Sequence, residues 1–366
     1  PGRPSPSAQL GQAGLDARLG GRQRGGQAVG QLREQLGMQR HLGLPFSGVD
    51  AGDGVELLLR EREPVPVQVG VRRRDAEHVL LAAALACSAW AARDARAKGI
   101  VGITSFEMES LTDWDRRVAN GFDIIQVQAS LYPERIHEAY ERGLRTGDSV
   151  AGVVSMGFLK LITDGSINTK TAYMHEPFCG TDLLGGLNTA EDELERLVRD
   201  AKAHNVTPAL HAIGDRANTV VIDAFEKVGV SGRIEHAQMV RPDDVARLAR
   251  LGLTASIQPT HAVDDRDVAD VLWCGRTDYA YPMRSFLDAG VPVVFGSDAP
   301  VARLDPWHTI RMATKRTADS RPAWHPEEAL TFEEALSCSQ RSTVEVGQPA
   351  DLISLTTDGE LAAVLG

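Results

Sequence analysis

Four residues that can bind a metal or transfer a proton lie in or at the end of short apolar runs in this 366-residue chain. His211, His236 and Asp298 each lie at the carboxyl end of a short apolar run, and Lys160 lies inside one. A buried lysine is costly unless it is neutral or paired. Two imidazoles, a carboxylate and an amine that converge on one face would suit a borderline divalent metal such as zinc.

Each of these residues also has a purely structural interpretation. A single histidine can be a hydrogen-bonded core residue, Lys160 can extend its amine to a rim, and Asp298 can begin a turn or cap a helix. The position of three such residues, His211, His236 and Asp298, at matching strand ends is much harder to explain in this way. The pattern therefore favours a shared site over three unrelated structural roles.

The elements that must position these residues alternate regularly after residue 75. Helical patterns such as 189–205 and 241–252 separate short apolar runs, with acidic residues near the helix start and Asn or Gly at the end. Seven such runs are predicted to be strands: 100–106, 122–128, 157–163, 206–211, 233–237, 253–259 and 291–297. Alternation of strands and helices predicts a parallel sheet, and an eight-stranded barrel would need one more unit.

The motifs in this order resemble a known family. "LKLITDGSINTKTAY", "LHAIGDRAN", "RIEHAQ", "SIQPTHAVDDRD" and "VFGSDAPVARLDPW" look like the amidohydrolase superfamily, and specifically its amidohydrolase-3 branch. Its members are metal-dependent hydrolases with a (β/α)8 TIM barrel. The resemblance runs from about residue 80 to about residue 355, and "VGQPADLISL" is similar to the strand that returns to a small β-sandwich.

The resemblance implies roles for the four residues. His211 and His236 would be metal ligands from the fifth and sixth strands, and Lys160 would be the fourth-strand lysine that many members carboxylate. Asp298 would touch the metal and accept the proton of the attacking water. The implied cofactor is a divalent metal, with zinc preferred and one or two ions bound.

One departure from the family pattern is large. The first strand should end in a His-x-His pair, yet none of the ten histidines lies two residues from another. The expected fold is therefore a TIM barrel that is incomplete at strand 1, open beside strands two and eight, with a β-sandwich remnant at the C-terminus.

Three segments are predicted. Residues 1–75 hold 11 arginines, no lysine and 14 glycines, and we interpret them as poorly ordered or as non-native coding sequence. Residues 76–340 would form the barrel, and residues 341–366 the sandwich strand.

The function implied is hydrolysis of a non-peptide C–N bond, in an amide or N-acyl compound, by metal-bound hydroxide. Asp215, Gln258, His261 and Arg276 lie in loops near the strand ends and could shape the substrate pocket. Two alternatives stay open, a catalytically impaired remnant of such an enzyme and a deaminase of the same barrel class.

Composition limits the partners. The net charge is -11 with no long run of one sign, so nothing favours nucleic acid or an anionic membrane, and the substrate is expected to be a small molecule.

No signal-peptide core follows the first arginines, and residues 78–92 are too short to span a bilayer and predict a buried helix. Four widely spaced cysteines predict no disulfide framework and a cytoplasmic location. A homo-oligomer stays open.

Overall fold

The computed structural model describes residues 46–51, 54–59, 70–72, 76–340, 352–356, 359 and 361–365. The chain divides into two compact units, residues 1–90 and 91–366. The first unit holds an antiparallel sheet with the order β1-β2-β3. Its strands are β1 (Phe46–Ala51), β2 (Gly54–Leu59) and β3 (Gly70–Arg72). Helix α2 (Ala76–Ala97) begins in this unit and ends in the second, and it includes the helix predicted at 78–92.

The second unit is built on one large sheet. Its main strands run in the order β11-β10-β9-β8-β7-β5-β4, every neighbouring pair on this path is parallel, and β6 (Ser149–Ala151) pairs antiparallel with β7. The bounds are β4 (Gly102–Ser105), β5 (Gln126–Leu131), β7 (Val154–Ile162), β8 (Pro208–Ala212), β9 (Arg233–His236), β10 (Thr254–Ile257) and β11 (Val293–Phe295). Each of the seven predicted runs contains or overlaps one of these strands.

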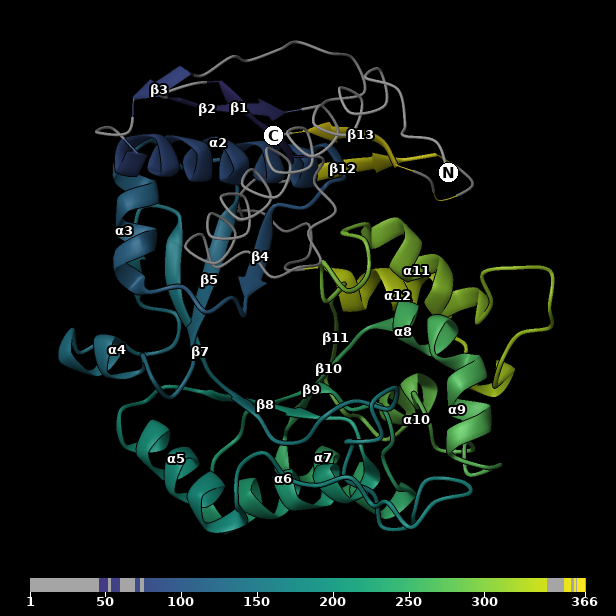
Figure 1. Cartoon of the computed structure of the whole chain (residues 1–366). Coiled ribbons are helices and arrows are strands. Elements are labelled where there is room, and N and C mark those ends of the chain that lie inside the picture. The colour runs from purple at the N-terminus through teal and green to yellow at the C-terminus, as the bar shows by residue number, and fades with distance from the viewer. Residues whose placement is uncertain are drawn as a thin grey trace, which may run out of the picture. The chain divides into compact units, whose positions relative to one another are not determined.

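The large sheet curls into part of a barrel (Figure 1). Within the described part of the chain, its path ends at β4 on one side and β11 on the other, and no strand joins these two edges. The prediction of a TIM-barrel fold that is incomplete at its first strand is confirmed. Strands β12 (Leu352–Leu355) and β13 (Leu361–Leu365) form a separate antiparallel pair, so part of the predicted C-terminal segment is a strand.

Helices connect the strands and cover the outer face of the curled sheet (Figure 1). The connecting helices are α3 (Leu111–Ala119), α4 (His137–Glu141), α5 (Glu191–Ala203), α6 (Asp215–Val228), α7 (Pro242–Leu251), α8 (Pro259–Asp264), α9 (Arg266–Leu272) and α10 (Met283–Asp288). After β11 come α11 (Pro306–Lys315), the 3-10 turn η2 (Pro326–Glu328) and α12 (Phe332–Ser339). Helix α7 has Pro242 in its first turn and ends at Gly252 with φ 63°, as the sequence predicts.

The strand register divides the sheet into an outer and an inner face. One row of paired residues is entirely apolar and is buried in the core: Leu161, Leu210, Ile234, Ala255 and Val293. Because side chains alternate along a strand, the next row faces the other way. That row carries Ile162, His211, Glu235, Ser256 and Val294. The helices bury the apolar row, so the polar residues are turned toward the inside of the curl.

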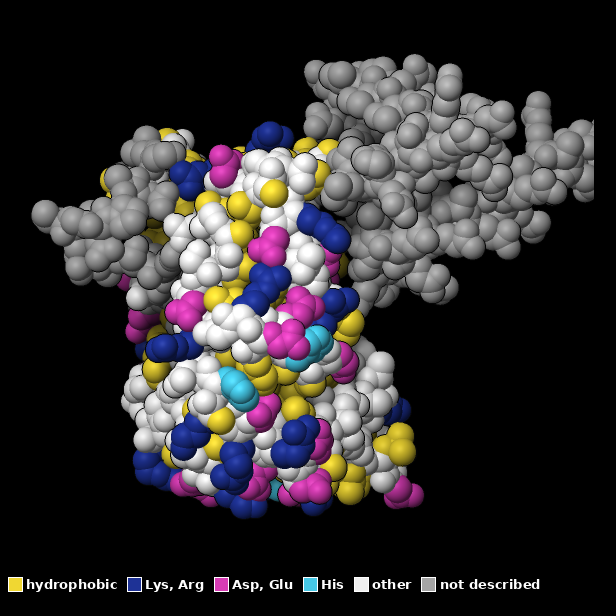
Figure 2. Space-filling model, turned by 90° about the vertical axis from the view of Figure 1, so that its left-hand side faces the viewer, with side chains coloured by type: hydrophobic (Ala, Val, Ile, Leu, Met, Phe, Trp, Pro, Cys, Tyr) yellow, Lys and Arg dark blue, Asp and Glu magenta, His cyan; other side chains and the backbone are white. Residues whose placement is uncertain are grey.

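The outer surface of the helices is charged. Figure 2 shows acidic and basic side chains interspersed on the side where α3, α4 and α5 lie in Figure 1. On α5, for example, Arg196 lies 2.6 Å from Glu193, a pair spaced for one helix face. Among the described helices, none combines the length and apolar composition that crossing a membrane requires.

The expectation of no disulfide is wrong for one cysteine pair. Cys179 and Cys274 form a disulfide, with Cα atoms 5.6 Å apart and a separation of 95 positions in sequence. The backbone N–H of Cys179 also donates to the carbonyl of Leu272 at 2.9 Å. Spacing along the chain gave no sign of this pair because two loops distant in sequence bring the cysteines together. Cys87 and Cys338 are free.

We therefore expect Cys179 and Cys274 to be linked in protein purified without reductant. Denaturation with an alkylating reagent, followed by peptide mass spectrometry, should find Cys87 and Cys338 alkylated and the other two joined. The Cys179→Ser variant should free Cys274 for alkylation, whereas the control Cys338→Ser should leave the link intact. Alkylation of all four cysteines in the unreduced wild type would contradict the pairing.

Candidate functional site

Four neighbouring parallel strands bring the candidate residues to one edge of the sheet. His211 is in β8, His236 is the last residue of β9, and Asp298 follows β11 by three residues. Strand β10 leads through Gln258 directly into α8, whose first turn carries His261. Since parallel strands end on the same side, the tertiary structure gathers residues separated by up to 87 positions in sequence (298 − 211).

Three histidine rings lie close together at this edge. The rings of His211 and His236 meet edge to face with centroids 4.5 Å apart. The rings of His236 and His261 are nearly parallel, with centroids 6.1 Å apart. Of the three, His211 and His236 were predicted as metal ligands, and His261 was predicted only as a pocket residue.

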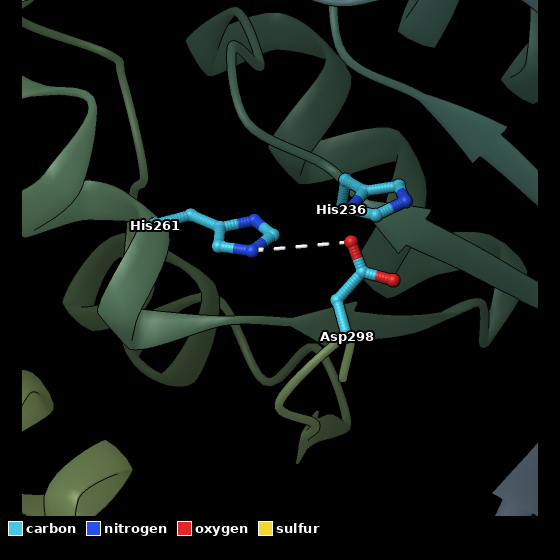
Figure 3. Close-up of side chains that lie close together, drawn as sticks. All are labelled: His236, His261 and Asp298. Carbon is cyan, nitrogen blue, oxygen red and sulfur yellow. Dashed lines mark ion pairs between the residues drawn. The ribbon is translucent and has the colours of Figure 1, made fainter. Parts of the chain in front are cut away.

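Asp298 faces the same cluster (Figure 3). Its Oδ2 atom lies 3.9 Å from Nε2 of His261. Burial raises the pKa of the Asp298 carboxyl, while the nearby side chains of His261, Lys160 and His211 act in the opposite direction. The side chain is nevertheless 39% exposed, so this carboxylate is open to solvent on one side.

Two of the site residues have unusual backbone conformations. His236 has φ 74° and Asp298 has φ 54°, in the left-handed region that residues other than glycine rarely occupy. Such conformations are found most often at functional sites, where the surrounding structure compensates their cost. His236 ends β9 and Asp298 lies three residues after β11, and the side chains of both point toward the cluster (Figure 3).

His236 is oriented by Gln258. The Nδ1 atom of His236 lies 2.8 Å from the side-chain oxygen of Gln258, which is buried. An amide oxygen only accepts, so Nδ1 carries the proton and Nε2 keeps its lone pair. Burial lowers the pKa of His236 well below its usual value, and the nearby His211, Lys160 and His261 lower it further. The imidazole is therefore neutral, the form that binds metals.

His211 is held by a residue that the sequence analysis missed. Asp164, fully buried two residues after the end of β7, has its Oδ1 atom 3.4 Å from Nε2 of His211. The carboxylate also accepts backbone N–H bonds from Ile213 at 3.1 Å, Gly214 at 2.9 Å and Tyr173 at 2.8 Å. A carboxylate at a strand end was the signal that identified Asp298, and the same signal was present in "LITDGS".

Lys160 lies on the inner face of β7, as its position between Leu159 and Leu161 requires. Its amine is buried and sits 4.5 Å from the ring centroid of Phe106. Burial lowers the pKa of Lys160, and the negative charge of Glu235 opposes that change. The uncharged amine is favoured here more than in water.

Glu235 and Arg233 complete the inner face and were also missed. Both belong to β9, and Nε of Arg233 lies 3.0 Å from Oε1 of Glu235. A second guanidinium nitrogen donates to Ser256 at 2.7 Å, and the group stacks 4.7 Å from the ring centroid of Phe158. The pair neutralises charge that would otherwise be buried alone beneath the histidines.

The remaining two predicted pocket residues are engaged in loop contacts. Asp215, buried at the start of α6, accepts backbone N–H bonds from His175 and Arg216, each at 2.9 Å. Arg276 donates to the carbonyls of Trp273 at 3.0 Å and Pro177 at 2.5 Å. None of these bonds involves the histidine cluster, so a pocket role for Asp215 and Arg276 stays a prediction.

A curled parallel sheet with imidazoles and a carboxylate at its carboxyl edge defines the class of TIM-barrel metal-dependent hydrolases. The chain belongs to the amidohydrolase family, whose model matches residues 58–360, more than half of the chain. The match begins inside the segment 1–75, which the sequence analysis separated from the barrel.

Curated relatives are similar to a part of the chain. The chain is 32% identical over 238 residues to the protein LONG AFTER FAR-RED 3 of Arabidopsis thaliana, covering 59% of this chain and 41% of that one. It is 27% identical over 223 residues to the N-substituted formamide deformylase of Arthrobacter pascens, covering 55% and 41%. The chain thus spans about two-fifths of the length of these relatives.

A solved structure shares the fold. An uncharacterised metal-dependent hydrolase from Pyrococcus furiosus superposes with a TM-score of 0.60 at 26% identity, covering 84% of this chain and 62% of that chain. The half-barrel described above therefore shares its fold with a metal-dependent hydrolase.

Asp164 supports both the loop backbone and His211, which yields a stability prediction. In Asp164→Asn, an amide nitrogen replaces an oxygen that accepts backbone N–H bonds, and the negative charge is lost. We expect the free energy of unfolding to fall by about 3 kcal/mol. Urea denaturation measures it. The exposed Asp182→Asn serves as the control and should change stability by less than about 0.5 kcal/mol. Equal stability of the two variants would contradict the anchoring role.

Proposed function

We propose that this protein is a metal-dependent hydrolase that cleaves a non-peptide C–N bond in a small amide or N-acyl compound. The observation that carries the proposal is the meeting of His211, His236 and Asp298 at the carboxyl edge of the sheet. Membership of the amidohydrolase family supports the reaction class. A relative named N-substituted formamide deformylase supports formamides as first test substrates.

The donor set fits a divalent metal, and zinc is our preferred candidate. Neutral imidazole and carboxylate are the nitrogen and oxygen ligands that zinc takes. His236 and Asp298 would hold the ion, and the family resemblance adds His211 and Lys160. When bound, such an ion acidifies water and polarises a carbonyl group.

Asp298 would carry the proton in this reaction. Its carboxylate is open to solvent on one side and faces the histidines on the other (Figure 3), so it can accept a proton from water and deliver it to the leaving nitrogen. The pKa of Asp298, raised by burial, makes the group a stronger base than an exposed aspartate.

The family resemblance implies that Lys160 serves this site in carboxylated form. The buried amine has a lowered pKa, and only the uncharged amine reacts with carbon dioxide. The neutral amine would form an N–C bond to carbon dioxide and release one proton, which leaves an anionic carbamate with ligand oxygens; the phenyl ring of Phe106 lies against the amine. Intact mass spectrometry under native conditions tests this through an added mass of one carbon dioxide that acid treatment removes.

One observation favours the second candidate, an impaired remnant. Within the described residues, no strand closes the sheet between β4 and β11, and the His-x-His pair of the family is absent from the sequence. Amine release from a panel of N-substituted formamides and N-acyl amines, with added Zn²⁺ or Co²⁺, separates the two candidates. Turnover supports the hydrolase, and no turnover by metal-loaded protein supports the remnant.

We also propose a cytoplasmic location and a small-molecule partner. The pair Cys179 and Cys274 offers a test of the location, because the cytoplasm keeps most thiols reduced. Rapid acid quenching of cells followed by alkylation should find both thiols free. A disulfide already present in the quenched cells would contradict the location.

The role of Asp298 gives a prediction for activity. The Asp298→Asn variant keeps the size of the side chain and removes the base, so the turnover number should fall by at least about 100-fold. The exposed Asp278→Asn is a matched control and should retain activity. Amine release is the measurement, with circular dichroism as the check on folding. An Asp298→Asn enzyme as active as the control would refute the proton-transfer role.

A further inference from the structure

The side chains of His236, His261 and Asp298 form the tightest group of metal-binding atoms in the described part of the chain. One potential ligand atom from each lies within 4.8 Å of the other two. His236 ends β9, His261 lies in α8 directly after β10, and Asp298 lies three residues after β11, so the group draws on three consecutive strands of the sheet. The group therefore needs no strand between β11 and β4.

The spacing is close to that of a metal site. Bonds of about 2.0–2.1 Å in tetrahedral geometry put ligand atoms about 3.4 Å apart. Oδ2 of Asp298 and Nε2 of His261 are already 3.9 Å apart. Asp298 is the most exposed of the three, and a small shift of its side chain would close the remaining distance.

The Nε2 atom of His236 is available to bind a metal. Its Nδ1–H donates to Gln258, whose amide nitrogen in turn lies 3.5 Å from the carbonyl of Ser256. The orientation of the Gln258 amide, and with it the proton on His236, is thereby fixed. An outer hydrogen bond of this kind orients most metal-binding histidines and leaves the other nitrogen free for the metal.

His261 has a buried nitrogen that no hydrogen bond satisfies. The residue is 7% exposed, and within the described residues its Nε2 atom makes no hydrogen bond although it points toward Asp298. A buried polar atom left without a hydrogen bond is costly. A metal ion between His261 and Asp298 would remove that cost.

Lys160 and His211 are less available. Nζ of Lys160 lies against the ring of Phe106. Nε2 of His211 lies 3.1 Å from the carbonyl of Gly165 and 3.4 Å from Asp164. Both groups already have partners, whereas Nε2 of His261 makes no hydrogen bond within the described residues and can bind a metal.

We propose that His261 is a metal ligand and that His236, His261 and Asp298 form a single-ion site for a borderline cation such as Zn²⁺ or Co²⁺. The proposal deepens the function proposed above and rests on it for the chemical role of the ion. It replaces Lys160 and His211 by His261 as the residue that completes the site.

Cobalt binding tests the assignment without any substrate. Stripped protein is titrated with CoCl₂, and bound cobalt is measured by elemental analysis after gel filtration and by visible absorption. We expect about one ion per wild-type chain, and an affinity at least about 10-fold lower for His261→Ala. The matched control His204→Ala, an exposed histidine at the end of α5 outside the cluster, should bind cobalt as the wild type does.

Free imidazole gives a second readout. If His261→Ala is folded by circular dichroism, added imidazole can fill the space and should restore cobalt binding. If that variant does not fold, His261→Asn replaces it in the titration. Wild type that binds no cobalt, or cobalt binding by the folded His261 variant that equals the wild type, would overturn the proposal.

Hydrolysis by the wild type, measured in parallel, separates this proposal from the proposed function. Cobalt binding that depends on His261, without hydrolysis of any formamide or N-acyl amine, would support the metal site and contradict the proposed function. Hydrolysis together with cobalt binding that is unchanged in the His261 variant would support the proposed function and contradict the His236, His261 and Asp298 site.

Discussion

The register of the parallel sheet is the constraint on which the site depends. Leu161, Leu210, Ile234 and Ala255 pair side by side and bury their side chains against the helices. Because a shift of one residue would turn every side chain to the other face, that apolar row fixes the register. The row beside it, with His211 and Glu235, is then forced to the inner face.

The inner face is polar, and this has an energetic consequence. Lys160, Glu235 and Arg233 are buried or nearly so in a region that a closed barrel fills with apolar side chains. Their charges are tolerable because Arg233 pairs with Glu235, and the lowered pKa of Lys160 favours the neutral amine. These paired charges lie under the histidines and contribute to the field in which a metal would be held.

Local backbone geometry then refines what the register places. His236 and Asp298 leave their strands in left-handed conformations, and Gln258 starts α8 immediately after β10. The short connection brings His261 to the same edge as the strand-end residues. A longer loop at this point would have carried the imidazole away from the cluster.

The sequence by itself determined the seven parallel strands, the helices between them, and the placement of His211, His236 and Asp298 at strand ends. These features follow from local periodicity, which each segment carries within itself. Only the tertiary structure decided the bonds of Asp164 to His211 and to the 213–214 backbone, the pairing of Cys179 with Cys274, and the approach of His261 to Asp298. Such contacts join segments that are distant in sequence, and their geometry is set by how the strands and loops pack rather than by any pattern along the chain.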